Sequence, residues 1–404
     1  MKLSDKKKIT QLTLLFMFTY MVSYMTRINY GAIISEMVAS TGMTKSMLSL
    51  ALTGSFVTYG AGQIISGICG DRFSPKKLVI YGLFLTSAMN VLIPFCSNHY
   101  QMLAVWCVNG FAQAFMWPPI VKLMTSHFND EEYKNASVKV SWGSSFGTIA
   151  IYLLSPLVIT AFGWKKVFFF SALFALAMIV VWNKFCIDTE SPVKTNSAQG
   201  ENKVSAKVLF SPLMLGVMLS IVLQGMLRDG VTTWMPSYIS ETYNLSSVIS
   251  ILTGVVLPVF SIVCFHITSG LYRKKLTNPM TCAGAIFAVG AVSSLLLYFV
   301  TGVNAGASVL FSALLTGAMH GVNLILICMI PPFFKKYGKV STVSGVLNSC
   351  TYIGSAISTY GIALISEKFD WGVTLLIWLG IAVLGTLMCF VCARPWKKKM
   401  QEEL

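Results

Sequence analysis

The chain has 404 residues, of which 55% are hydrophobic and only 11% charged, and its mean hydropathy is +0.70. Soluble globular proteins carry roughly 25% charged residues, so this composition excludes an ordinary soluble protein. The formal net charge is +15, but the basic residues form short clusters between apolar blocks. That spacing argues against a nucleic-acid-binding face and indicates a protein embedded in a lipid bilayer.

Twelve apolar segments follow one another along the chain, each long enough for a helix to cross about 30 Å of hydrocarbon. The first one follows a basic N-terminus but lacks a signal-peptide cleavage pattern, so we read it as a span. Together they predict an all-α membrane protein with twelve transmembrane helices. The expected spans are 9–38, 46–69, 77–96, 101–127, 136–161, 165–186, 209–240, 247–271, 278–300, 305–333, 341–366 and 371–393.

One long polar stretch, residues 188–207, separates the sixth segment from the seventh. It combines Pro, Gly, Ser, Asn and charged residues without an apolar period, which is typical of a flexible linker. We therefore expect an N-terminal half at 1–187, a cytoplasmic linker at 188–207 and a C-terminal half at 208–404, each half containing six helices.

The lysine and arginine positions predict the orientation. If both termini are cytoplasmic, twenty-two basic residues fall on the cytoplasmic side and four on the other, namely Lys45, Lys165, Lys166 and Lys368. Cytoplasmic loops of membrane proteins carry such an excess. We expect a multi-pass protein of the cell membrane, and the short loops favour a bacterial inner membrane.

The two halves repeat each other. Carriers built from two such halves place the substrate between them, near the middle of the bilayer. Three features recur at corresponding positions: a proline pair (Trp117-Pro118-Pro119 and Ile330-Pro331-Pro332), a glycine before a basic turn (Gly70 and Gly270) and an arginine deep within a span (Arg27 and Arg228).

Arg27 and Arg228 are the strongest functional candidates. An arginine in the middle of a membrane helix costs about 2.5–3.5 kcal/mol, and two would repel each other unless an anion lay between them. Asp229 adjoins Arg228 but is expected to point about 100° away around the helix. We therefore favour an anion clamp over structural ion pairs, because guanidinium groups bind phosphate or carboxylate through two hydrogen bonds.

Other polar residues are expected to line a cavity around the arginines. Tyr20 and Tyr24 share one helix face with Arg27. Each of the remaining candidates could instead only bridge two helices through hydrogen bonds, and for His320 both interpretations stay equally open. These candidates are Tyr59, Gln63, Gln224, His320, Asn323, Asn348 and Tyr352.

Catalytic motifs are missing from the sequence. It contains no nucleophile–base set and no phosphate-binding glycine loop, and its ten cysteines have no metal-ligand spacing. We expect neither an enzyme nor a protein with a cofactor or metal, and transport driven by gradients rather than by ATP.

Residues 67–77 read GICGDRFSPKK and follow the second span. This segment resembles the signature loop of the major facilitator superfamily, in which a glycine-led turn is followed by an Asp-Arg pair and basic residues. The resemblance implies a fold of two six-helix halves and a gating role, at the cytoplasmic face, for Asp71 and Arg72.

Along its whole length the chain also resembles the organophosphate:phosphate antiporters, which include bacterial glycerol-3-phosphate and hexose-phosphate transporters. In that family the two arginines hold the substrate's phosphate. Two positions depart from the pattern, because Gln63 stands where a lysine is usual and Ser144 stands near a usual histidine. The shared residues are Tyr20, Tyr24, Arg27, Tyr59-Gly60, Trp117-Pro118-Pro119, Leu227-Arg228-Asp229-Gly230, Trp234, Pro236-Ser237-Tyr238 and Tyr352-Ile353-Gly354.

The resemblance implies a monomeric carrier that exchanges a small organic phosphate for inorganic phosphate. The lost auxiliary charges leave open a proton-coupled symporter of a sugar acid or another carboxylate. A membrane sensor of a phosphorylated metabolite, without transport, also stays open. An exporter of cationic drugs is the weakest alternative, because the expected cavity is positively charged.

Overall fold

The structure, a computed structural model, describes residues 5–188, 211–337 and 340–403, and these are helical with no strand among them. The predicted linker therefore lies outside the described residues except for Asp188. The first group of helices is α1 (Lys6–Ala32), α2 (Ile34–Thr41), α3 (Lys45–Arg72), α4 (Pro75–Leu92), η1 (Ile93–Phe95), α5 (His99–Gln113), α6 (Trp117–His127), α7 (Asp130–Phe162) and α8 (Lys165–Phe185). The second is α10 (Pro212–Tyr243), α11 (Ser247–Thr253), α12 (Val256–Lys274), α13 (Pro279–Val300), α14 (Ala305–Asn323), η2 (Leu324–Cys328), η3 (Pro331–Tyr337), α15 (Val340–Lys368) and α16 (Trp371–Glu403).

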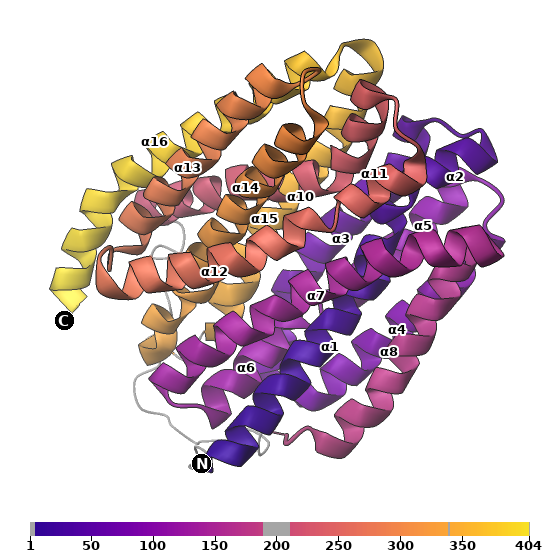
Figure 1. Ribbon diagram of the computed structural model, residues 1–404. Helices are drawn as coiled ribbons and strands as arrows, with labels where there is room; N and C mark the ends of the chain where they lie inside the picture. The colour runs from indigo at the N-terminus through magenta and orange to yellow at the C-terminus, as the bar shows by residue number, and fades with distance from the viewer. Residues whose placement is uncertain (1–4, 189–210, 338–339, 404) are drawn as a thin grey trace.

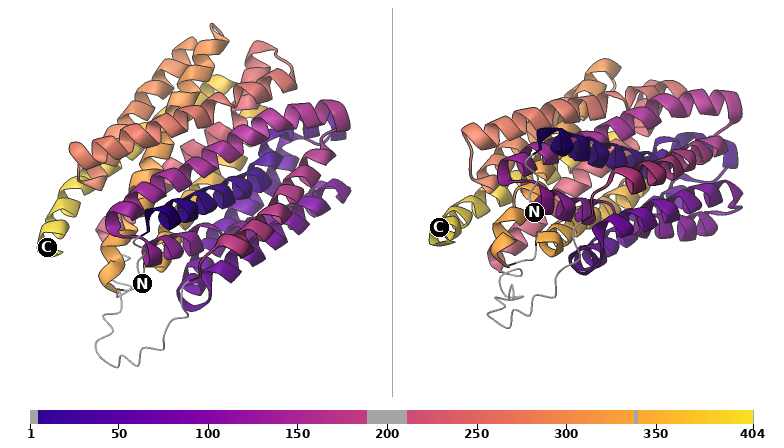
Figure 2. Two further views of the ribbon diagram at one scale, coloured as in Figure 1. Left: turned by 60° about the horizontal axis from the view of Figure 1, so that its bottom comes forward. Right: turned by 90° about the horizontal axis from the view of Figure 1, so that it is seen from below.

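The helices before and after the linker form two groups that lie side by side (Figures 1 and 2). The groups meet where α3 packs along α15 and where α7 packs along α12. The start of α1 and the end of α16 lie at the same end of the bundle (Figure 1). An even number of crossings would produce this arrangement.

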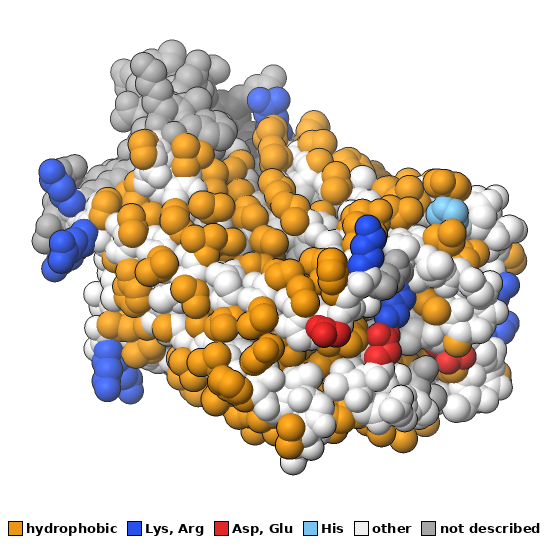
Figure 3. Space-filling view, turned by 90° about the horizontal axis from the view of Figure 1, so that it is seen from above, with side chains coloured by type: hydrophobic (Ala, Val, Ile, Leu, Met, Phe, Trp, Pro, Cys, Tyr) orange, Lys and Arg blue, Asp and Glu red, His pale blue; other side chains and the backbone are white. Residues whose placement is uncertain are grey.

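Ten helices among the described residues are long and apolar enough to cross a membrane. A broad band of hydrophobic side chains covers the face drawn in Figure 3, with basic side chains at its left end and charges of both signs to the right. These features indicate a multi-pass membrane protein. The two predicted spans without such a helix are 101–127 and 341–366, so the count of twelve stays a prediction.

Several predicted spans are not single helices. The expectation of one continuous helix over 101–127 is wrong, because α5 ends at Gln113 and α6 begins at Trp117. Proline has no N–H to donate and disfavours helical backbone before it, so the Pro118-Pro119 pair interrupts the helix. In the second half, span 305–333 changes from α14 to the π-helix η2 and then, at Pro331, to the 3-10 helix η3.

Two further spans are divided into a short helix and a long one. Predicted span 9–38 bends at Ile33, between α1 and α2, and predicted span 247–271 bends at Gly254 and Val255, between α11 and α12. The segment expected as a gating loop is also partly helical. Residues 67–72 form the last turns of α3, which ends at Arg72, and the non-helical turn is confined to Phe73 and Ser74.

Glycines allow close helix packing in both halves, between α1 and α7 in the first half and between α10 and α15 in the second. A Cβ added to Gly143 or Gly147 of α7 would lie 2.3 or 2.4 Å from a carbonyl oxygen of α1. A Cβ added to Gly225 of α10 or Gly354 of α15 would lie 2.0 Å from a carbonyl oxygen of the other helix. Helix pairs in membranes rely on such small residues. This packing brings Arg27 on α1 and Arg228 on α10 toward the interior.

Candidate substrate site

Arg27 is buried at the interface between the two helix groups, with only 7% of its surface exposed. Its Nη1 atom donates a hydrogen bond of 3.0 Å to the hydroxyl of Tyr352 on α15. Its guanidinium carbon lies 4.2 Å from the ring centroid of Tyr24 and 4.9 Å from that of Tyr59. Aromatic faces attract a cation, so this surrounding stabilises the charge of Arg27, and no carboxylate of the described residues is in direct contact with it.

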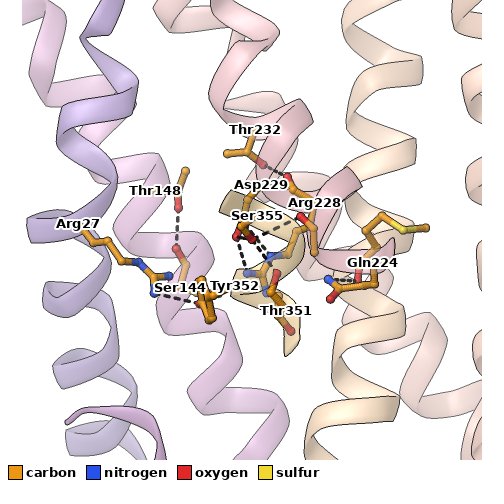
Figure 4. A network of polar contacts seen from close by, with 12 residues as sticks. Arg27, Ser144, Thr148, Gln224, Arg228, Asp229, Thr232, Thr351, Tyr352 and Ser355 are labelled. Atoms are coloured by element: carbon orange, nitrogen blue, oxygen red, sulfur yellow. Dashed lines mark hydrogen bonds and ion pairs between the residues drawn. The ribbon is translucent and has the colours of Figure 1, made fainter. Parts of the chain in front are cut away.

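Arg228, 3% exposed, is held differently. Its Nε and Nη2 atoms donate to Oδ1 and Oδ2 of Asp229 at 2.7 and 2.8 Å. The expectation that Asp229 points away from Arg228 is therefore wrong. The two side chains leave the helix about 100° apart around its axis. The long arginine side chain nevertheless reaches around the helix surface to the short carboxylate. Ser355 of α15 also donates to Asp229 Oδ2, at 2.6 Å (Figure 4).

Tyr352 lies between the two arginines, and Figure 4 shows its hydrogen bond with Arg27. The Arg27 and Arg228 guanidinium carbons lie 5.4 and 5.6 Å from the centroid of its ring. The ring also packs against that of Tyr59, with centroids 4.1 Å apart and the ring planes tilted by 51°. One side chain of the C-terminal half thus contacts the arginines of both halves, and the predicted residues Arg27, Tyr59, Arg228 and Tyr352 do come together.

A small cavity of about 20 Å³ opens beside Arg228. Its walls include Tyr20 and Tyr24, which pack edge to face with centroids 5.0 Å apart. Two buried N–H donors of cavity residues, Asn323 Nδ2 and Trp117 Nε1, have no hydrogen-bond partner within the described part of the chain. Buried donors are normally satisfied, so this wall is suited to a ligand with acceptor oxygens.

The other predicted residues divide into two sets. Ser144, His320 and Asn348 line the same cavity, and Ser144 donates to the Ser141 carbonyl oxygen at 2.7 Å. Gln63 and Gln224 bridge helices instead. Gln63 donates to the Ala114 carbonyl oxygen at 3.2 Å and accepts from Asn348 at 3.0 Å, and Gln224 donates to the Met319 carbonyl oxygen at 3.1 Å.

The predicted gating pair lies far from this cavity. Asp71 and Arg72 are the last two residues of α3, and in the turn that follows them Ser74 donates to Asp188, just beyond the end of α8. The Arg72 side chain is exposed, and the side chain of Asp71 lies outside the described residues.

Sequence reasoning missed the role of Asp229 as the partner of Arg228, and it also missed Tyr152 on α7. The Tyr152 hydroxyl donates to the Thr232 carbonyl oxygen of α10 at 3.1 Å and closes a second cavity beside Arg27 and Asp229. The presence of an acidic residue within an apolar span was the available signal for Asp229. Nothing in the sequence distinguishes Tyr152 from the other tyrosines.

The site is closed toward both ends of the bundle. At the end opposite the termini, Lys45 pairs with Glu241 and the hydroxyls of Ser35 and Ser237 lie 3.4 Å apart. At the end with the termini, Arg273 donates twice to Asn135, at 3.2 Å. The cavities around the arginines measure only about 20 to 30 Å³, room for about one water molecule each. Cavities of this size are too small to hold an organic solute.

Comparisons with known proteins agree with this architecture. The model of the Major Facilitator Superfamily matches residues 16–359. The chain is 23% identical to the membrane sensor protein UhpC of Salmonella typhimurium, covering 87% of this chain and 84% of that protein. It is 24% identical to the glycerol-3-phosphate transporter of Bacillus subtilis, covering 86% and 84%. It is 21% identical to a probable hexose phosphate transport protein of Chlamydia muridarum, covering 88% and 84%.

The family match covers most of the chain, and the family consists of membrane transporters rather than enzymes. The resemblance inferred from the Asp71-Arg72 segment and the two arginines is therefore confirmed at the level of the family. The chain is a multi-pass membrane protein of the Major Facilitator Superfamily and has that family's fold.

Proposed function

We propose that this chain carries a small organic phosphate, such as a glycerol phosphate or a hexose phosphate, across the membrane in exchange for inorganic phosphate. The main observation is that two buried arginines, one from each half, contact the same tyrosine ring, Tyr352. A guanidinium group stays charged and matches phosphate oxygens with two parallel hydrogen bonds. The relatives named as glycerol-3-phosphate and hexose phosphate transporters support this substrate class.

The arrangement also suggests how binding would drive transport. Arg27 and Arg228 belong to different halves, so an anion held by both joins the halves across the cavity. The energy of that contact lowers the barrier to rocking, and the site then opens to one side at a time. In this proposal twelve spans cross the membrane, both termini are cytoplasmic, Asp71 and Arg72 gate the cytoplasmic side, and the monomer is the working unit.

The test is exchange in liposomes loaded with labelled inorganic phosphate. Exit of label should require external glycerol-3-phosphate or glucose-6-phosphate, and it should vanish in Arg27→Gln and Arg228→Gln. Arg394→Gln is the matched control, because Arg394 is exposed near the end of α16. Retained exchange in either site variant, or no exit with any phosphate ester from folded wild-type protein, would refute the proposal.

A sensor of a phosphorylated metabolite is the second candidate, favoured by the similarity to the sensor UhpC over 87% of this chain. The two candidates predict the same ligand contacts at Arg27 and Arg228 but differ in flux. Phosphate-ester binding to the purified protein, combined with no exchange in liposomes, would identify a sensor.

A further inference from the structure

Asp229 occupies one of the two edges of the Arg228 guanidinium group that can hold an anion through two hydrogen bonds. It accepts from Nε and Nη2, at 2.7 and 2.8 Å, which is the two-point geometry in which a guanidinium group also binds phosphate. The substrate and Asp229 therefore compete for one side of Arg228. If the proposed function holds, the Arg228–Asp229 pair must open whenever an anion binds there.

The charges decide how that pair opens. Arg27, Arg228 and an ionised Asp229 give a net charge of +1, whereas a protonated Asp229 leaves +2. The Asp229 side chain is only 16% exposed. If it were displaced while ionised, it would lie beside the bound anion in a poorly solvated site, where like charges repel strongly. Displacement as the neutral acid avoids that repulsion.

Among the groups around the two arginines, Asp229 is the side chain best suited to accept a proton. It is the only carboxylate among the described residues that line the three cavities around the arginines. The cavity wall from α12 contributes Leu257, Pro258 and Ser261, none of which titrates. The titratable, charged or hydrogen-bonding groups near Asp229 are Arg228 on α10, Arg27 and Tyr24 on α1, Tyr152 on α7, His320 on α14, and Tyr352 and Ser355 on α15.

Resting on the proposed function, we propose that Asp229 is a proton-binding site of this carrier and takes up one proton each time an anion binds to Arg228. The proton moves from water to a carboxylate oxygen, the Arg228–Asp229 hydrogen bonds break, and the anion's oxygens take the freed donors. A dianion therefore enters together with one proton. The inorganic phosphate that leaves in exchange carries one proton in the opposite direction, so the exchange moves no net proton through Asp229.

The experiment measures proton uptake when inorganic phosphate binds to the purified full-length protein in weak buffer at pH 8. Wild type should take up close to one more proton per bound phosphate than Asp229→Asn, in which the amide imitates the neutral acid. Phosphate affinity of wild type should fall about tenfold for each unit of pH above the midpoint of the coupled titration, and that of Asp229→Asn should lack this added dependence. His320→Asn tests the other titratable cavity residue, and each phosphate that this variant still binds should bring the extra proton.

A second variant protects the test if Asp229→Asn does not fold. Ser355→Ala removes the hydrogen bond that holds Asp229 ionised, at 2.6 Å, so the midpoint pH of phosphate binding should move upward. Equal proton uptake in wild type and Asp229→Asn, an unchanged midpoint in Ser355→Ala, or loss of the extra proton in His320→Asn would overturn the assignment. Absence of phosphate binding to wild type would instead refute the proposed function on which it rests.

Discussion

The hydroxyl of Tyr352 accepts a hydrogen bond from Nη1 of Arg27 at 3.0 Å, across the interface between the two halves. The Tyr352 ring also lies 5.6 Å from the guanidinium carbon of Arg228. Tyr352 therefore contacts both arginines, and a ligand that draws Arg27 toward Arg228 would lengthen this hydrogen bond. Under the proposed function, the residue belongs to the binding site as well as to the packing of α3 against α15.

Tyr352→Phe removes the hydroxyl and keeps the contacts of the ring with Tyr59 and the two arginines. A hydrogen bond to a charged group contributes about 1.5–3 kcal/mol, so Arg27 should become less well positioned. We expect the KM for exchange to rise about tenfold or more, and Tyr352→Ala to lose transport altogether. Uptake of a labelled phosphate ester over a concentration series measures both effects.

The matched control for that series is Tyr360→Phe, because Tyr360 lies on the same helix with 36% of its surface exposed. It should transport like wild type. Equal KM values for Tyr352→Phe and Tyr360→Phe would show that the hydroxyl of Tyr352 contributes nothing to the site.

Gly354→Ala should separate α15 from α10. The added Cβ would lie 2.0 Å from the Val222 carbonyl oxygen, and backbone cannot yield as a flexible side chain can. Overpacking of this kind costs about 1–3 kcal/mol. We expect a lower Tm in detergent and weaker transport, because the shift of α15 also moves Tyr352.

Gly361→Ala is the comparison on the same helix, since a Cβ there meets nothing within 4 Å. Its Tm should match or slightly exceed that of wild type, because alanine favours the helix over glycine. A similar loss of stability in both variants would mean that helix propensity, rather than close approach to α10, controls the result.

Glu241→Gln should favour opening at the end of the bundle opposite the termini. Glu241 on α10 pairs with Lys45 at the start of α3 and accepts from Trp371 Nε1 at 3.1 Å. The pair is partly exposed and is worth at most about 1 kcal/mol, or about a fivefold change in population. A cysteine placed at Ser237, which is buried at this closure, should react faster with an impermeant maleimide in the variant.

The exchanged pair Lys45→Glu with Glu241→Lys restores opposite charges and should return the labelling rate toward that of wild type. High salt should raise the wild-type rate, because it screens an exposed ion pair. An unchanged rate in Glu241→Gln at low salt would show that this ion pair does not hold the closure.

The sequence predicts best the residues whose chemistry is unusual for their segment, such as a charged residue within an apolar span. Arginines within apolar spans are costly, so Arg27 and Arg228 stand out, and the repeat of the two halves predicts that they lie near each other. Tyr20 and Tyr24 follow from helical spacing relative to Arg27. The motif at Asp71 and Arg72 indicates the family, and the family match confirms it.

Side-chain direction could not be predicted in the same way. Helical spacing fixes the direction in which the side chains of Arg228 and Asp229 leave the helix, but a long side chain can still bend back to its neighbour. Gln63 and Asn348 are 285 residues apart, so their hydrogen bond depends on how α3 and α15 align. Pro118 was visible as a marker of the repeat, yet only the structure shows that one helix ends at Gln113 and that Pro118 lies in the first turn of the next.

The orientation in the membrane stays a prediction that Cys96 can test. With cytoplasmic termini, Cys96, which follows η1 and is the last residue of the third predicted span, faces the outside. Partial burial raises the pKa of its thiol, so little thiolate is present at neutral pH and reaction with maleimide should accelerate as the pH is raised toward 9. In intact cells, an impermeant maleimide should therefore label the protein, increasingly at higher pH, and Cys96→Ser should lose this signal.

Cys186, at the predicted cytoplasmic end of α8, has a thiol pKa raised to about 12 by burial and should not contribute even after permeabilisation. Labelling of Cys96 that requires permeabilised cells would reverse the proposed topology, because the basic clusters would then lie outside.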